Sequence, residues 1–205
     1  MFLSKSIENA VSEFSKLPGV GKKTAFRYVL QLIKNEAEKN EELSTAILNL
    51  KLNLKNCEIC NVSNDNKICD ICSNVTRPET QICVVEGLKD LIAVENTHQY
   101  HGKYHVLGGV ISPIDGIGPN ELFIESLEKR IEKLQEPVEL IMALNPTIEG
   151  DTTVYYLSKK LSKFPVTITT ISRGISFGSE LDYADELTLG RSIHSRQPYD
   201  QLINK

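Results

Sequence analysis

Four cysteines between residues 57 and 72 constrain the fold of this chain more than any other feature. Two residues separate Cys57 from Cys60, two separate Cys69 from Cys72, and eight residues join the pairs. Each C-x2-C turn directs two thiolates to one point, so two such turns complete a tetrahedral site of four sulfur atoms. Because protein fills all four positions, the spacing predicts a structural Zn²⁺ site and not a catalytic one.

Two other interpretations of the cysteines stay open. The same four-sulfur geometry suits iron, and the thiols could also pair as disulfides. The N-terminus, MFLSKSIENAVSEF, lacks the apolar segment and small-residue cleavage site of a secretory signal. We therefore expect a reducing cytoplasm, where clustered thiols bind metal. The fifth cysteine, Cys83, lies in an apolar run and is expected to be buried in a strand.

The charge is distributed unevenly along the 205 residues. The net charge is −4, but residues 1–56 hold nine Lys or Arg and six acidic residues, while the remainder carries a charge of −7. A local basic patch can bind phosphate on an otherwise acidic protein. The length suits one large domain or two small ones. With no run of 18 apolar residues, no membrane-spanning helix is expected.

The basic N-terminal part contains a glycine turn between two predicted helices. Residues 4–15 favour a short helix, and L-P-G-V-G-K-K-T-A-F-R at 17–27 predicts a tight turn with a helix resuming at Lys22. Lys23 and Arg27 fall on the face opposite to the apolar residues. This helix–hairpin–helix pattern is typical of proteins that grip the nucleic-acid backbone without reading bases. The alternative is a turn between two core helices with a solvated basic face.

A third helix is predicted at residues 41–55. Its apolar side chains recur at helical spacing and form one stripe. We expect this stripe to belong to a core: Leu43, Ile47, Leu50 and Leu54.

After the cysteines, strands and helices alternate. Apolar runs predict strands at 82–85, 104–107, 138–143 and 166–171. Helical patterns lie at 88–97, 120–135 and 151–162. This order predicts an α/β fold with a mainly parallel sheet flanked by helices. Ligands on such sheets bind at the carboxyl ends of strands, where Glu86 and the loop 145–151 are expected.

The segment V-V-E-G-L-K-D-L-I-A-V-E resembles the Toprim domain of primases, topoisomerases and certain nucleases. In that family a glutamate at a strand end works with a later Asp-x-Asp to hold Mg²⁺, which prefers hard oxygen ligands. Glu86 and Asp90 match the first part. The second part falls at residues 145–147, Asn-Pro-Thr, where both acids are missing. Glu149 and Asp151 are expected in the following loop. The resemblance therefore implies a Toprim fold with little or no catalysis.

The chain as a whole resembles the RecR family of bacterial recombination mediators. The resemblance is carried by the glycine turn at 17–27, the four-cysteine knuckle, V-V-E-G-L-K-D at 84–90, Y-H-V-L-G-G-V-I-S-P-I-D-G-I-G-P at 104–119, L-N-P-T-I-E-G at 144–150 and the segment 171–189. These pieces span nearly the whole chain in one order. One departure is that Lys22 stands where the family often has proline, which adds positive charge.

The resemblance implies a non-enzymatic, cytoplasmic DNA-binding protein of DNA repair. It would act with RecO, and with RecF in some cases, to load RecA on single-stranded or gapped DNA. It would assemble as a ring-shaped homo-oligomer, most simply a tetramer. It implies one structural Zn²⁺ per chain and four parts: a helix–hairpin–helix domain at 1–56, a zinc finger at 57–76, a Toprim domain at 77–172 and an oligomerisation tail at 173–205. The implied site residues are Lys22, Lys23 and Arg27 for DNA, Cys57, Cys60, Cys69 and Cys72 for zinc, and Glu86, Asp90 and Glu149 for partner contact.

Two other classes of function compete with this expectation. A Toprim nuclease or primase-like phosphotransferase would use Mg²⁺ with Glu86, Asp90, Glu149 and Asp151. A zinc-stapled interaction protein would never touch nucleic acid. Binding to DNA separates the last class from the first, and metal-dependent cleavage or synthesis would reveal an enzyme.

Overall fold

The computed structural model describes residues 4–134, 136–176, 178, 180–196 and 198. The chain divides into two compact units, Met1–Leu54 and Lys55–Lys205, so the boundary falls just before the cysteine module. Part of the predicted tail at 173–205, including residues 199–205, lies outside the described residues. No helix in the described parts of the chain is long and apolar enough to cross a membrane.

The first unit begins with two helices joined by a glycine turn, as predicted. Helix α1 (Lys5–Ser15) is capped by the Ser4 hydroxyl, which accepts a hydrogen bond from the Ile7 N–H at 3.4 Å. Helix α2 (Lys22–Lys34) buries Ala25 and Val29. The rings of Phe14 and Tyr28 meet edge to face at 6.0 Å between centres and join the two helices.

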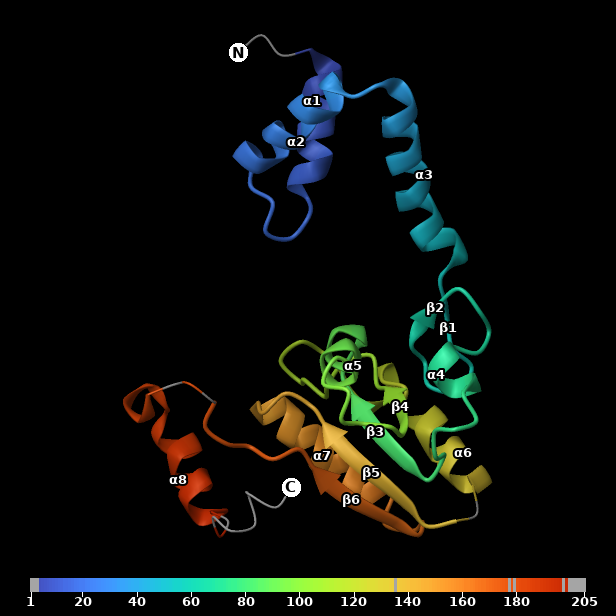
Figure 1. Ribbon diagram of the computed structural model, residues 1–205, viewed down its shortest axis with the longest axis vertical. Coiled ribbons are helices and arrows are strands. Elements are labelled where there is room, and N and C mark those ends of the chain that lie inside the picture. The colour runs from blue at the N-terminus through green and yellow to red at the C-terminus, as the bar shows by residue number, and fades with distance from the viewer. Residues whose placement is uncertain (1–3, 135, 177, 179, 197, 199–205) are drawn as a thin grey trace. The chain divides into compact units, whose positions relative to one another are not determined.

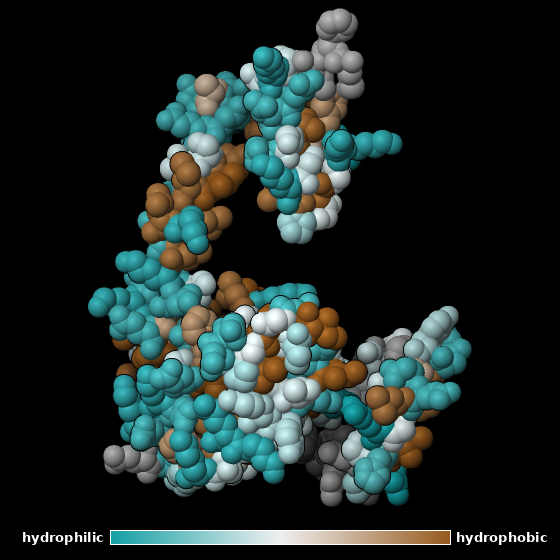
Figure 2. Space-filling model, turned by 180° about the vertical axis from the view of Figure 1, so that it is seen from behind, coloured by the Kyte–Doolittle hydropathy of each residue, from teal (hydrophilic) through white to brown (hydrophobic). Residues whose placement is uncertain are grey.

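The third helix, α3 (Ala37–Asn53), differs from the prediction in its burial. The apolar stripe expected in a core is exposed to solvent, with Leu43 at 42%, Ile47 at 54%, Leu50 at 62% and Leu54 at 40% exposure. Figure 2 shows the resulting brown, apolar surface along α3. The prediction was wrong for the single chain, because helical spacing identifies an apolar face without showing what covers it.

The second unit starts with the cysteine module and continues into a four-stranded sheet. The module contains a two-stranded antiparallel ladder, β1 (Lys55–Asn56) with β2 (Ser63–Asn64), and the short helix α4 (Asp70–Ser73). The sheet has the order β4-β3-β5-β6, and all its neighbouring strands are parallel. Its strands are β3 (Gln81–Val85), β4 (Lys103–Val106), β5 (Val138–Ala143) and β6 (Val166–Thr170). The predicted α/β class with a mainly parallel sheet is confirmed.

Helices lie on both faces of the sheet (Figure 1). Besides α4, the helices of this unit are α5 (Leu88–Glu95), α6 (Ile124–Leu134), α7 (Ile148–Lys160) and α8 (Glu186–His194), with short 3-10 turns η1 (Pro119–Glu121) and η2 (Leu181–Tyr183). Alternating residues of β3 enter different cores, because successive strand side chains point to opposite faces. Ile82 and Val84 pack with α6 and α7, whereas Cys83 and Val85 pack with α5 and the cysteine module.

The start of α7 corrects one expectation. Glu149 and Asp151 were expected in a loop, but both lie in the first turn of this helix. The Thr147 hydroxyl accepts a hydrogen bond from the Gly150 N–H at 3.1 Å and so begins the helix at Ile148. Acidic residues in a first turn are also stabilised by the helix dipole.

Candidate metal centre and nucleic-acid interface

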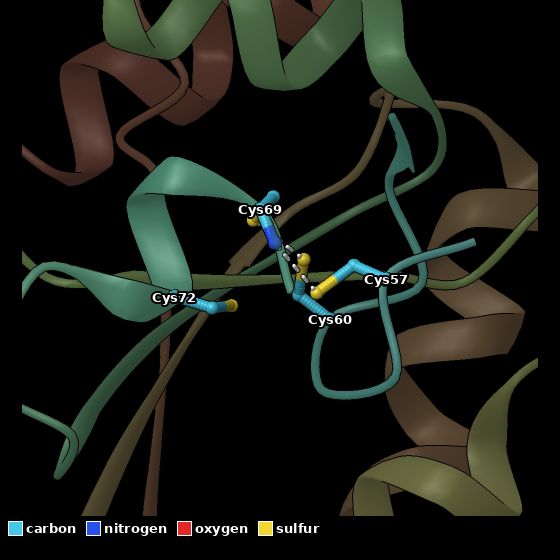
Figure 3. Close-up of side chains that lie close together, drawn as sticks. All are labelled: Cys57, Cys60, Cys69 and Cys72. Carbon is cyan, nitrogen blue, oxygen red and sulfur yellow. Dashed lines mark hydrogen bonds between the residues drawn. The ribbon is translucent and has the colours of Figure 1, made fainter. Parts of the chain in front are cut away.

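The four predicted cysteine ligands converge on one buried point. Their sulfur atoms all lie within 4.8 Å of one another, and the side chains come from the turn after β1 and from the region of α4, as Figure 3 shows. The sulfur atoms of Cys60 and Cys69 are 3.5 Å apart, far beyond a disulfide bond of about 2.05 Å. A tetrahedral zinc site with Zn–S bonds of about 2.3 Å requires sulfur separations of about 3.8 Å. The arrangement therefore fits one metal ion and not a disulfide.

Without a cation the four thiols do not all ionise, because the pKa values of Cys60 and Cys72 are raised. Hydrogen bonds from Cys60 and Cys72 lower the pKa of Cys69 to about 2. The pKa of Cys60 is raised because its thiol is hydrogen bonded to Cys69 and Cys72 and because burial disfavours the thiolate. Four thiolates cannot gather in a buried site without a compensating positive charge. The Cys69 backbone N–H also points at the Cys57 sulfur at 3.4 Å, a donor suited to a thiolate. The residues present thus fit a divalent metal ion.

The cysteine module is joined to the edge of the sheet. The Val106 N–H of β4 donates to the Cys60 carbonyl at 2.8 Å, so the first knuckle continues the hydrogen bonding of the edge strand. Asn61, in a left-handed conformation with φ 62°, donates from its side-chain amide to the Ser126 hydroxyl at 2.9 Å. These contacts cover a strand edge that would otherwise be free to pair with another chain.

Lys103 completes this junction and was missed in the sequence. Its side chain is almost fully buried, and its ammonium donates to the carbonyls of Ile71 at 3.0 Å, Cys72 at 2.9 Å and Asn74 at 2.6 Å. These carbonyls lie at the C-terminal end of α4, where helices leave acceptors without partners. The only sequence signal was a lysine at the start of an apolar strand, and the predicted strand began one residue later.

The predicted DNA-contacting residues lie together on the first unit. Lys22, Lys23 and Arg27 are all exposed on α2, and Lys23 and Arg27 lie on the side away from buried Ala25 and Val29. Among the described residues, none of these three cations forms an ion pair. The preceding turn closes with a hydrogen bond from the Val20 N–H to the Leu17 carbonyl at 3.0 Å, and Gly19 has φ 77°, which favours glycine. The turn and the three cations form one exposed basic surface.

The Toprim-type residues are only partly brought together. Glu86 follows β3 and Asn145 follows β5, and the Asn145 amide donates to the Glu86 carboxylate at 2.8 Å. The Asp90 carboxylate accepts from the Gly87 N–H at 3.0 Å and caps α5. Within the described part of the chain, no three carboxylate or histidine groups approach closely enough to hold a metal ion, and only the four cysteines do so. The structure does not assemble the acids into a cluster that would hold Mg²⁺.

Asp151, another of the Toprim-type acids, binds an arginine instead of sharing a ligand with the other acids. Asp151 forms an ion pair with Arg173, which follows β6, and a hydrogen bond from the guanidinium holds the pKa of that carboxyl below its ordinary value. Glu149 lies two residues earlier in the same first turn of α7 and is half-buried. Glu86, Asp90 and Glu149 therefore remain as an acidic surface at the carboxyl edge of the sheet, without a shared ligand.

Two further side chains, Tyr104 and Cys83, are packing residues. Tyr104 is fully buried, its ring meets that of Tyr100 edge to face at 5.1 Å, and its hydroxyl donates to the Glu95 carboxylate at 2.7 Å. Stacking of Tyr104 on a nucleic-acid base is excluded by this burial. Cys83 is 2% exposed within β3, as predicted.

These features define a class of protein: a helical hairpin with a basic surface, a four-cysteine metal module and a Toprim sheet whose acids do not form a metal site. Comparison with known families agrees. The family described as RecR, helix-hairpin-helix matches residues 7–51, the Toprim domain family matches residues 80–172, and the family described as RecR, C-terminal matches residues 174–197.

Full-length relatives give the same result. The chain is 50% identical over 199 residues to the recombination protein RecR of Cytophaga hutchinsonii, covering 97% of both chains. It is 51% identical over 198 residues to the one from Amoebophilus asiaticus, covering 97% of this chain and 98% of the relative. For Flavobacterium johnsoniae the identity is 52% over 202 residues, with 98% of each chain covered. The chain belongs to the RecR family of recombination proteins.

Proposed function

We propose that this protein is a non-enzymatic, DNA-binding recombination mediator in DNA repair. The observation that carries the proposal is the exposed basic surface formed by Lys22, Lys23 and Arg27 beside the glycine turn. Backbone N–H groups at a turn that opens a helix attract phosphate, and the neighbouring cations neutralise it. Such contacts position the protein on nucleic acid without reading its sequence.

The metal in the cysteine module is zinc in this proposal. Four sulfur ligands leave no open coordination position, so the ion has a structural role, one per chain. Cys57, Cys60, Cys69 and Cys72 would hold it, and its chemistry is limited to balancing the thiolate charge. Metal analysis of the purified protein distinguishes zinc from iron in the same four-sulfur site.

The acidic surface of Glu86, Asp90 and Glu149 serves partner proteins rather than catalysis. Two features support this assignment. The Glu86 carboxylate is occupied by the Asn145 amide, and the acids lie at the carboxyl edge of a parallel sheet, where ligands of such folds bind. The partners proposed are RecO, and in some cases RecF, with the joint action of loading RecA on single-stranded or gapped DNA in the cytoplasm.

A ring-shaped homotetramer would strengthen the weak basic surface of one chain. The apolar stripe on α3 is exposed, and so are Leu181, Leu187 and Ile193 in the C-terminal segment, at 59–64%. Exposed apolar faces of this kind mark subunit contacts. Repeating one basic surface around a closed ring converts separate weak contacts into one tight interaction. The parts proposed are 1–56 for DNA, 57–76 for zinc, 77–172 for partners and 173–205 for assembly.

The test is DNA binding as a function of salt concentration. For the wild type, the logarithm of affinity should fall with the logarithm of salt, with a slope of about −0.9 for each duplex phosphate neutralised. The double variant Lys23→Glu/Arg27→Glu should lose binding and flatten the slope. Lys39→Glu, on exposed α3 of the same unit, is the matched control and should retain both. Equal binding by wild type and double variant would exclude this DNA surface.

Light scattering with and without a gapped duplex tests assembly and binding in one experiment. A mass of four chains that increases on adding DNA is expected. A strictly monomeric particle that ignores DNA would contradict both the ring and the mediator role.

A further inference from the structure

A cavity lies between the cysteine module and the Toprim part of the second unit. Its volume is about 340 Å³, and its walls come from the first cysteine knuckle, from α4, from the start of β4 and from α6. Ile59 of the knuckle and Leu134 of α6 supply apolar wall. Ligand sites in proteins are cavities of about 300–1,000 Å³ with apolar walls and a few converging polar groups. The size is sufficient for a ligand as large as one nucleotide.

Positive charge is concentrated around this cavity. Lys103, Lys129, Arg130 and Lys133 all line it, in a part of the chain whose net charge is −7. Two acids also line it, Glu58 and Glu79.

Among the described residues, neither acid forms an ion pair with any of the four cations. Glu58 faces Lys67 at 3.5 Å, and Lys129 is paired with Glu125 at 2.6 Å. Within the described residues, no carboxylate lies within ion-pair distance of Lys103, Arg130 or Lys133. The Lys103 ammonium is occupied by three carbonyls, so Arg130 and Lys133 are the cations available to attract an anion to this cavity.

Arg130 is held in place before any ligand arrives. One of its terminal nitrogens donates to the Tyr104 carbonyl at 2.7 Å, and the side chain is half-buried beside the cavity. A guanidinium carries five N–H donors in a planar fork, so this single bond leaves donors for a phosphate. Lys133, one turn further along α6, adds an exposed cation on the same side of the helix.

We propose that this cavity binds a nucleoside phosphate. Its phosphate would contact Arg130 and Lys133, and its apolar sugar or base face would lie against Ile59 and Leu134. The same chemistry is offered by a free mononucleotide and by one nucleotide of a DNA strand. The site is separate from the glycine turn of the first unit and does not depend on the role proposed for Lys23 and Arg27.

The experiment measures binding with the glycine-turn surface removed. All variants carry Lys23→Glu/Arg27→Glu, and the probe is a fluorescent, 5′-phosphorylated thymidine hexanucleotide at low salt, followed by anisotropy. Lys133→Glu should weaken binding about tenfold, as expected for loss of a charge-assisted contact. Lys163→Glu is the matched control, because Lys163 is 62% exposed in the same unit but pairs with Glu128 away from the cavity. It should change affinity less than twofold.

Competition identifies the source of the phosphate. Thymidine monophosphate that displaces the probe in a Lys133-dependent way indicates a free nucleotide site, and failure to displace it indicates a strand site. Either result supports the cavity. Three results would overturn the cavity as a binding site. Lys133→Glu could weaken binding no more than Lys163→Glu does, or have no effect. Inorganic phosphate could displace the probe as effectively as the nucleotide does. If the Lys23→Glu/Arg27→Glu variant binds DNA like the wild type, the proposed function is contradicted. The comparison of Lys133→Glu with Lys163→Glu still tests the cavity in that case.

Discussion

The ammonium of Lys103 lies 2.9 Å from the carbonyl oxygen of Cys72, one of the four cysteines that could hold a metal ion. A buried cation of the edge strand β4 thus closes the last turn of the cysteine module. The module in turn accepts a hydrogen bond from Val106 on the same strand. The same module therefore gathers the four cysteines and protects the edge of the sheet.

Replacing Lys103 should destabilise the protein strongly. Lys103→Met keeps most of the side-chain volume but removes the ammonium donor from the carbonyls of Ile71 and Cys72, while the Asn74 carbonyl still accepts from the Arg77 N–H at 3.4 Å. Each buried acceptor left unsatisfied costs about 1–3 kcal/mol, so we expect a loss of about 2–6 kcal/mol in unfolding free energy. Urea unfolding followed by circular dichroism measures it. Lys67→Met, at an 83% exposed side chain, is the control and should change stability by less than about 0.5 kcal/mol.

Metal removal should open the sheet at β4 first. Structural zinc contributes about 10–16 kcal/mol in isolated finger peptides, so a chelated module cannot keep its fold. Hydrogen exchange followed by mass spectrometry should show lost protection at β4, while β5, paired on both sides inside the sheet, exchanges more slowly. Unchanged exchange at β4 with all metal removed would show that the module does not protect the edge.

The features that could be predicted from the sequence are those determined by residues close together in the chain. The paired cysteines specify a metal site because each C-x2-C turn places its two sulfur atoms close together by local structure alone. The apolar run at 82–85 specifies a buried strand because both faces of a parallel sheet are covered. The glycine turn before Lys22 specifies the helical hairpin, because tight turns require residues such as Gly19.

The features that could not be predicted from the sequence are contacts between residues that lie far apart along the chain. The bond between Glu86 and Asn145 joins residues 59 positions apart and exists only because β3 and β5 are adjacent. The partners of Lys103 are likewise carbonyls, which carry no side-chain signal. The exposed stripe on α3 has the same pattern as a core helix, and only the tertiary structure shows that Leu50 is 62% exposed among the described residues.

Acid should destabilise the second unit through His105. Burial lowers the pKa of this histidine from 6.5 to about 4, and its Nε2 lies 2.8 Å from the Phe123 carbonyl. Between pH 6.5 and 4 the unfolded chain binds a proton that the folded chain does not. The contribution is fully present above pH 6.5 and is lost as the pH falls to about 4, by about 3 kcal/mol in total.

The measurement is unfolding free energy against pH for wild type and for His105→Gln. The variant is less stable at pH 7 but should lose less stability on acidification, because its side chain does not titrate. The difference between the two curves removes the contribution of the carboxylates, which titrate in both proteins. Parallel curves between pH 6.5 and 4 would assign the acid sensitivity to other groups.

Asn145→Asp should create a weak site for divalent cations. In the wild type, the Asn145 amide points an N–H at the Glu86 carboxylate and occupies the place where a second acid would help hold Mg²⁺. Exchanging that donor for a carboxylate places two oxygen ligands together, which repel each other unless a cation binds. Calorimetric titration with Mn²⁺ should detect binding by the variant and none by the wild type. The double variant Glu86→Gln/Asn145→Asp again has one carboxylate and should lose the binding. If Asn145→Asp and wild type titrate alike, the Glu86–Asn145 contact is not what prevents metal binding at this edge of the sheet.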